Sequence, residues 1–131
     1  MAVLQKVFPS LPILVVDDDE ESLLAFATTL RTAGVTNIRT VSTSTAVPTM
    51  LNLEAFSLVL LDLNMPSLSG YDILGKAAEL TSRPPFIIVT GSLPPQDSVM
   101  RLTSDVVAYL TKPVDRERLV GVVLAVLNES R

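Results

Sequence analysis

Several polar side chains that could do chemistry stand directly after short apolar runs of the sequence. They are Asp17, Asp18, Asp19, Asp62, Thr90, Thr111 and Lys112. If these runs are parallel strands, their carboxyl ends meet at one edge of a sheet, which brings Asp17, Asp18 and Asp62 together. Carboxylates that close repel each other strongly unless a cation lies between them.

The donor atoms of this cluster indicate which chemistry it favours. The chain has no histidine and no cysteine, which excludes imidazole bases, thiolate catalysis and zinc sites built from these residues. Oxygen donors alone favour a hard cation such as Mg²⁺. A metal ion, Lys112 and the Thr90 hydroxyl around one carboxylate describe a site for a phosphoryl group carried on that carboxylate.

Each of these residues also has a simpler interpretation. An acidic run between a strand and a helix commonly caps the helix, and a single Asp in a loop is commonly a turn residue. A Thr or Lys after a strand is commonly structural or solvated. The combination is harder to explain in this way, because all of these residues fall at the same edge of the predicted sheet.

The composition narrows the class of protein. The 131 residues suit one domain, and 48% hydrophobic residues are enough for a core. The net charge of −4 argues against direct nucleic acid binding. No targeting segment is visible, and the longest apolar run, 119–127, is far shorter than the ~20 residues of a membrane helix. We therefore expect a cytoplasmic protein that does not enter a membrane.

Two kinds of segment alternate along the chain. Apolar runs that suit strands buried on both faces lie at 13–16, 57–61 and 86–89, with weaker candidates at 38–41 and 108–110. Helical patterns lie at 20–33, 71–80 and 115–128, with weaker candidates at 45–53 and 95–103. Gly34 can end the first helix, and Asp115 can cap the last. The alternation predicts an α/β fold, a five-stranded parallel sheet with helices on both faces.

Four short motifs, in this order and spacing, resemble the receiver domain of two-component response regulators, the family of the chemotaxis regulators. They are Val15-Val16-Asp17-Asp18-Asp19, Leu61-Asp62-Leu63-Asn64-Met65-Pro66 with Gly70, Val89-Thr90-Gly91 and Tyr109-Leu110-Thr111-Lys112-Pro113. The resemblance covers about residues 11–128. We therefore assign residues 1–10 to a loose lead-in and residues 11–131 to the receiver domain. The resemblance also implies a flavodoxin-like, doubly wound sheet with strand order 2-1-3-4-5.

The resemblance implies a phosphoacceptor and a magnesium site. Asp62 would accept the phosphoryl group from the phosphohistidine of a sensor histidine kinase or from a phosphotransfer protein. Asp18 and Asp62 would bind Mg²⁺ through their carboxylates, Asn64 through its backbone carbonyl, and Asp17 through water. The domain would catalyse only its own phosphorylation and dephosphorylation, with no turnover substrate.

A conformational switch is implied as well. Lys112 would pair with a phosphoryl oxygen, and its bond to Pro113 would be cis. Thr90 would hydrogen-bond the phosphoryl group, and Tyr109 would change rotamer as Thr90 moves. The change would reach a surface of helix 95–103, strand 108–110 and helix 115–128, where a homodimer or an output partner could bind. The last helix has almost no polar face, which indicates either this interface or burial under the sheet and loops.

The sequence departs from the family pattern at four positions. Ser69 stands where an acid is common, Ser44 stands where glycine is common, and Pro48 lies within the predicted helix 45–53. Asp105 replaces a glycine that usually ends the fourth helix. We expect these changes to alter the surface around the fourth helix and not the acidic site.

Two alternatives remain open at this point. A phosphatase of the haloacid dehalogenase type would use Asp17 as its nucleophile, although Glu21 stands where Thr or Val is usual and the chain is short for that class. A degenerate receiver would take no phosphoryl group and would act only as a docking module.

Overall fold

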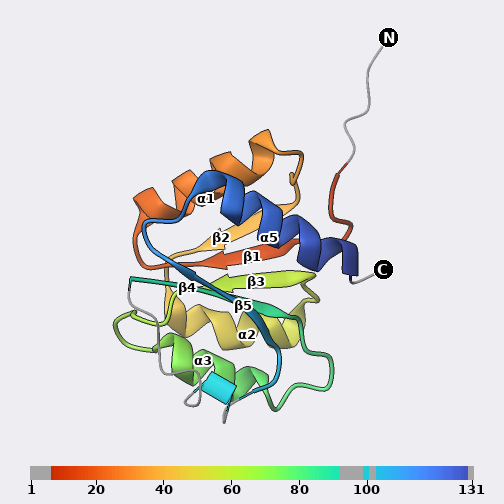
Figure 1. Ribbon diagram of the computed structural model, residues 1–131. Helices are drawn as coiled ribbons and strands as arrows, with labels where there is room; N and C mark the ends of the chain where they lie inside the picture. Colours follow the sequence, from red (N-terminus) through yellow and green to blue (C-terminus); the bar gives the residue numbers. More distant parts are fainter. Residues whose placement is uncertain (1–6, 92–98, 101–102, 130–131) are drawn as a thin grey trace.

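The computed structural model describes residues 7–91, 99–100 and 103–129, in which strands and helices alternate (Figure 1). The strands are β1 (Ile13–Val16), β2 (Ile38–Val41), β3 (Leu58–Leu61), β4 (Phe86–Thr90) and β5 (Val106–Thr111). The helices are α1 (Glu20–Thr32), α2 (Val47–Leu53), α3 (Gly70–Ala77) and α5 (Arg116–Glu129), and a 3₁₀ turn, η1 (Ser44–Ala46), precedes α2. All strands pair in parallel in the order β2-β1-β3-β4-β5, which confirms the predicted fold class and strand order.

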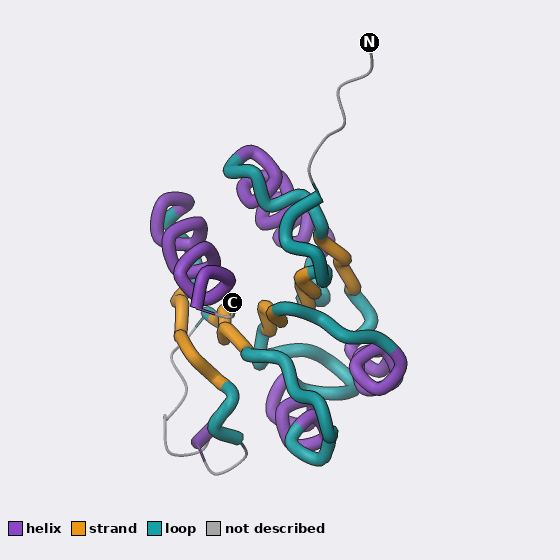
Figure 2. Tube along the Cα trace, turned by 90° about the vertical axis from the view of Figure 1, so that its right-hand side faces the viewer, coloured by secondary structure: helices purple, strands orange, loops and turns teal. Residues whose placement is uncertain are grey.

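The sheet lies between two helix layers, with α1 and α5 on one face and α2 and α3 on the other (Figure 1, Figure 2). Successive residues of a strand point to opposite faces. Ile13 and Val15 of β1 therefore pack in the cluster that includes α1 and α5, whereas Leu14 and Val16 pack in the cluster that includes α2 and α3. This two-sided burial explains why β1, β3 and β4 are continuous apolar runs.

The ends of α1 fall at the capping residues that the sequence offers. Asp19 Oδ1 accepts a hydrogen bond from the Glu21 backbone N–H at 3.1 Å. At the other end Gly34 has a φ of 95°, and its N–H donates to the Arg31 carbonyl at 3.0 Å. Because glycine adopts this positive φ without steric cost, it ends the helix where the sequence predicted, to within one or two residues.

The predicted helix 45–53 differs from the structure at its start. The turn η1 comes first, and Pro48 falls in the first turn of α2. Proline is tolerated there because the first N–H groups of a helix have no partner inside it. Strand β5 is longer than the predicted 108–110, and α3 ends at Ala77 rather than at residue 80. The predicted helix 95–103 falls mostly outside the described residues.

Helix α5 buries large apolar residues on one side and exposes small residues on the other. Its buried residues are Leu119, Val123, Val126 and Leu127. Gly121 and Ala125 are exposed on the opposite side. Among the helices of the described ranges, none has the length and apolar character needed to cross a membrane.

The end of the expected loose lead-in is held against the turn that precedes β2. The Asn37 side-chain amide donates to the Pro9 and Ser10 carbonyls at 3.0 and 3.1 Å. The Thr36 N–H donates to the Phe8 carbonyl at 2.8 Å. Residues 8–10 therefore contact the folded unit, and residues 1–6 lie outside the described residues. The boundary between lead-in and domain stays a prediction.

Candidate functional site

The candidate site lies at the carboxyl ends of β1, β3 and β5. Val16 and Leu61 pair across β1 and β3, so Asp17 and Asp62 follow the two strands at the same level of the sheet. The Asp62 N–H donates to the Val16 carbonyl at 3.1 Å, which extends the strand pairing by one residue. The parallel register thus brings these two carboxylates to one place.

Three carboxylates gather at this end of the sheet. Oxygen atoms of Asp17, Asp18 and Asp62 all lie within 4.8 Å of one another. Asp17 and Asp62 are buried, with 1% and 6% of their surface exposed, whereas Asp18 is exposed to solvent. Burial strengthens the repulsion between like charges, so this arrangement requires positive charge nearby.

Lys112 supplies part of that positive charge. Its Nζ lies 2.6 Å from Asp17 Oδ2 and 3.1 Å from Asp62 Oδ2. Burial acts to lower the pKa of Lys112, but the hydrogen bonds and charges of Asp17 and Asp62 outweigh this effect and raise the pKa above its usual 10.5. One ammonium group against three carboxylates leaves two negative charges, which a divalent cation would balance. Hard carboxylate oxygens beside the exposed Asp18 fit Mg²⁺ well.

The two buried carboxylates, Asp17 and Asp62, have the same pattern of hydrogen-bond partners. Asp17 Oδ1 accepts a hydrogen bond from the Asp19 N–H at 2.9 Å, and Asp62 Oδ1 accepts one from the Asn64 N–H at 3.0 Å. The Oδ2 atom of each carboxylate faces Lys112. Because both oxygens of each group have a partner, the carboxylates are fixed before any ligand arrives.

Asn64 joins this cluster to the end of β4. Its side-chain amide Nδ2 donates to Thr90 Oγ1 at 3.0 Å, and Thr90 is 1% exposed. The resemblance implied a role only for the Asn64 backbone carbonyl, and this side-chain contact was not predicted. The sequence carries no direct signal for it, because the Asn64 amide reaches Thr90 only through the path of the loop after β3.

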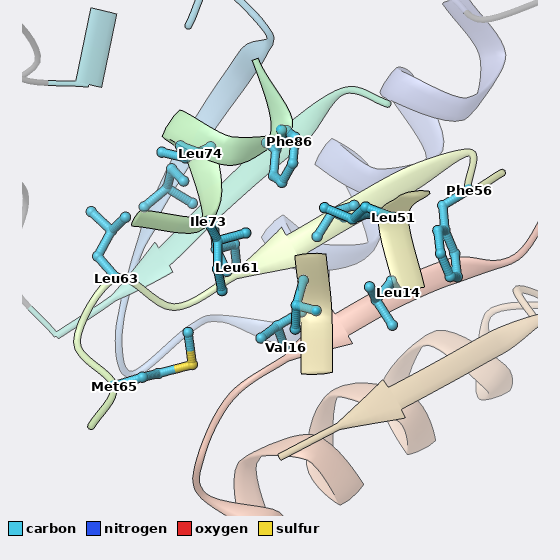
Figure 3. Close-up of a cluster of buried hydrophobic side chains, with 14 of the residues drawn as sticks. Leu14, Val16, Leu51, Phe56, Leu61, Leu63, Met65, Ile73, Leu74 and Phe86 are labelled. Atoms are coloured by element: carbon cyan, nitrogen blue, oxygen red, sulfur yellow. The ribbon is translucent and has the colours of Figure 1, made fainter. Parts of the chain in front are cut away.

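The loop after β3 is anchored by alternate residues. Leu63 and Met65 are buried in the hydrophobic cluster with Ile73 (Figure 3). Asp62 and Asn64 alternate with them, and their side chains contact Lys112 and Thr90. Gly70, at the start of α3, approaches this loop so closely that a Cβ atom there would lie 2.5 Å from the Asp62 carbonyl oxygen. Core packing and the start of α3 therefore both set the position of the Asp62 backbone.

Tyr109 lies on β5, three residues before Lys112. It pairs in register with Ile88, two residues before Thr90 on β4, and is half-buried. Burial raises the pKa of the Tyr109 phenol, and the neighbouring Tyr71 raises the pKa further. The Lys112–Pro113 bond is cis, as the resemblance implied. The proposed rotamer change of Tyr109 stays a prediction.

Three comparisons with known proteins agree with one another. The family profile described as "Response regulator receiver domain" matches residues 13–124. Response regulator protein TmoT of Ectopseudomonas mendocina is 30% identical over 116 residues, which are 88% of this chain and 52% of TmoT. This chain spans about half the length of such curated relatives.

Solved structures give the same result. A CheY-like response regulator receiver domain protein from Methanospirillum hungatei has a TM-score of 0.79 at 30% identity, and the match covers 90% of this chain and 94% of that one. The response regulator DrrB of Thermotoga maritima has a TM-score of 0.74 at 29% identity, with 92% and 54% covered.

Proposed function

The chain belongs to the response regulator receiver domain family, and from this premise we propose that Asp62 accepts a phosphoryl group in a Mg²⁺-dependent reaction. The observation that carries the proposal is the pair of contacts from Lys112 to Asp17 and Asp62. These contacts leave a net negative, oxygen-lined cluster beside a buried carboxylate that is already oriented. Phosphoryl transfer depends mainly on such positioning and charge neutralisation.

The proposed donor is a phosphohistidine of a sensor histidine kinase or of a phosphotransfer protein. A carboxylate oxygen of Asp62 attacks phosphorus, the phosphorus–nitrogen bond to the donor breaks, and the histidine recovers its lone pair. Asp18, Asp62, the Asn64 carbonyl and, through water, Asp17 would hold Mg²⁺, which supplies charge neutralisation for the phosphoryl oxygens. Lys112 orients one of these oxygens. Its ammonium group exchanges the contact with the Asp62 carboxylate for a contact with that phosphoryl oxygen.

Thr90 connects this event to the rest of the domain. Its Oγ1 already accepts a hydrogen bond from Asn64, so its single hydrogen is available to donate to a phosphoryl oxygen. We propose that the resulting movement of Thr90 changes the Tyr109 rotamer, and with it a surface on β5 and α5 that binds a second copy or an output partner. The domain works in the cytoplasm and catalyses only its own phosphorylation and hydrolysis.

The two alternatives make different predictions. If Asp17 were the nucleophile of a phosphatase, the protein would hydrolyse phosphate esters repeatedly. Membership of the receiver domain family argues against this alternative. A degenerate receiver would show no phosphorylation at all. Both are decided by the experiment that tests the proposal.

The test uses acetyl phosphate as a small phosphoryl donor and intact-mass spectrometry as the readout. With Mg²⁺ the protein should gain one phosphoryl group, and Asp62→Ala should gain none while staying folded. Asp19→Asn is the matched control, because asparagine also caps α1, and it should behave like the wild type. Phosphorylation of Asp62→Ala, or none in the wild type, would overturn the assignment.

A further inference from the structure

Ser44 is a buried hydroxyl at a junction where the family often has glycine. It follows β2, lies in η1, and is only 6% exposed. Its Oγ donates to the Pro66 carbonyl at 3.0 Å and accepts from the Leu68 N–H at 3.3 Å. One side chain of the β2–α2 junction therefore binds the loop that follows β3 at two points.

The turn that Ser44 spans is strained. Ser67 has a φ of 68°, which is unfavourable for a residue with a Cβ atom. The Leu68 N–H also donates to the Pro66 carbonyl at 2.8 Å, so Ser67 is the centre of a γ-turn. Strained conformations persist when their surroundings over-determine them. Here the Ser44 hydroxyl joins the two backbone groups on either side of Ser67.

This turn is adjacent to the acidic cluster. The same loop carries Asp62 and Asn64. One cavity is lined by residues of the turn, of the acidic cluster and of the β2–α2 junction, among them Asp18, Ser44, Pro66 and Ser67. The first half of the loop is anchored in the core through Leu63 and Met65, but Pro66 and Ser67 are exposed. The contact with Ser44 thus restrains the half of the loop that the core does not hold.

We propose that Ser44 is a positioning residue for the metal site. By fixing the strained turn at Ser67, its hydroxyl restrains the loop beyond Met65 and so limits movement of the Asn64 carbonyl that would bind Mg²⁺. This role rests on the proposed function, because it concerns the affinity of that site. It adds a third segment of the chain, the β2–α2 junction, to the two strand ends that carry the carboxylates.

The test measures two quantities in each variant. Calorimetry gives the Mg²⁺ affinity, and amide hydrogen exchange in the metal-free protein gives the protection of the Leu68 N–H. Ser44→Ala should weaken Mg²⁺ binding about three- to tenfold, the size expected for the loss of buried hydrogen bonds, and should speed exchange at Leu68.

Two further variants separate positioning from general stability. Ser67→Gly in the Ser44→Ala background should restore most of the Mg²⁺ affinity, because glycine adopts the positive φ without strain. Thr45→Ala removes an exposed hydroxyl from the next residue and should change neither quantity. If Ser44→Ala does not fold, Ser44→Gly removes the same hydroxyl and should show the same loss.

The outcomes distinguish this inference from the proposed function. If the wild type binds Mg²⁺ and Ser44→Ala binds it equally well, the role of Ser44 is refuted and the proposed function stands. A loss that Ser67→Gly fails to restore also refutes it, because the hydroxyl would then act through something other than the turn. A wild type that takes up no Mg²⁺ refutes both.

Discussion

Two regions at the carboxyl end of the sheet are held in different ways. Around Asp17 and Asp62 the contacts are charged, short and buried, and among the described residues no buried side-chain polar atom lacks a partner. Around Tyr109 the strand is at the edge of the sheet, Val107 beside it is 52% exposed, and the tyrosine is half-buried. The first region is held by charge, and the second by neutral contacts.

This difference indicates how the two regions divide the work. Rearranging the charged cluster is costly because buried charges lose their partners. Breaking one buried ion pair costs about 3–5 kcal/mol. Breaking one neutral hydrogen bond, in contrast, costs only about 1 kcal/mol. A change of charge at Asp62 can therefore shift the β4–β5 side at a lower cost than a rearrangement of the whole cluster.

The largest effect is expected at Lys112. Lys112→Met leaves the buried Asp17 and Asp62 carboxylates without their cation. The free energy of unfolding in metal-free buffer should fall by about 2–4 kcal/mol, less than for a fully buried pair because the Lys112 side chain is partly exposed. Added Mg²⁺ should recover part of this loss, because the ion replaces the missing positive charge. Urea denaturation with and without Mg²⁺ measures both effects. Lys76→Met removes an exposed lysine from α3 and is the control, and equal losses in the two variants would contradict the account.

Gly70 tests whether the loop after β3 has a fixed position. In Gly70→Ala the new Cβ would lie 2.5 Å from the Asp62 carbonyl oxygen and 2.6 Å from Leu63 Cα, so the backbone must shift. We expect a loss of about 1–3 kcal/mol in stability, measured by urea denaturation, and weaker Mg²⁺ binding. Gly121→Ala, on the exposed face of α5 with nothing within 4 Å, should instead be neutral or slightly stabilising. A Gly70→Ala protein with unchanged stability and metal affinity would argue against the fixed loop.

Thr90 connects the two regions, and a smaller effect is expected there. Thr90→Val keeps the shape but removes the acceptor of the Asn64 amide, which should cost about 0.5–1.5 kcal/mol in urea denaturation. Because the chain has no tryptophan and only two tyrosines, tyrosine fluorescence reports on Tyr71 and Tyr109 directly. Phosphorylation should change this fluorescence in the wild type and in Thr90→Ser, but not in Thr90→Val. The same change in all three proteins would show that Thr90 does not transmit the signal.

The smallest effect concerns the ionisation of Tyr109. Burial, with a contribution from Tyr71, raises the pKa of Tyr109 above the usual 10.0. In Tyr71→Phe, an absorbance titration should therefore give Tyr109 a pKa that is lower than in the wild type but still above 10.0. Since the pKa is raised in the folded state, the associated stability is complete below pH 10.0 and is lost as the pH rises through the raised pKa. Ionisation at or below pH 10.0 would mean that the ring is freely solvated.

Much of the fold could be predicted because short apolar runs and single capping residues mark its strands and helix ends. The runs at 13–16 and 58–61 are apolar at every position, which suits only elements buried on both faces, and Gly34 marks the end of α1. Once the strands are parallel, their register alone brings Asp17 and Asp62 together. These features need no knowledge of loop conformation.

The contacts that hold the site could not be predicted in the same way. The Asn64 amide and the Ser44 hydroxyl find their partners only through the path of the loop after β3. That path depends on a positive φ at Ser67, a residue type that seldom adopts one. The start of α2 was missed for a related reason, because a 3₁₀ turn replaces the first predicted turn.

The central claim is that acids from two strand ends form one site that needs a divalent cation. Calorimetric titration of the metal-free protein with Mg²⁺ tests it most directly. We predict one binding site in the wild type and in Asp19→Asn, and no measurable binding in Asp18→Asn, which removes a carboxylate of the cluster without breaking a Lys112 contact. Absence of Mg²⁺ uptake by the wild type, or equal uptake by Asp18→Asn, would contradict the account.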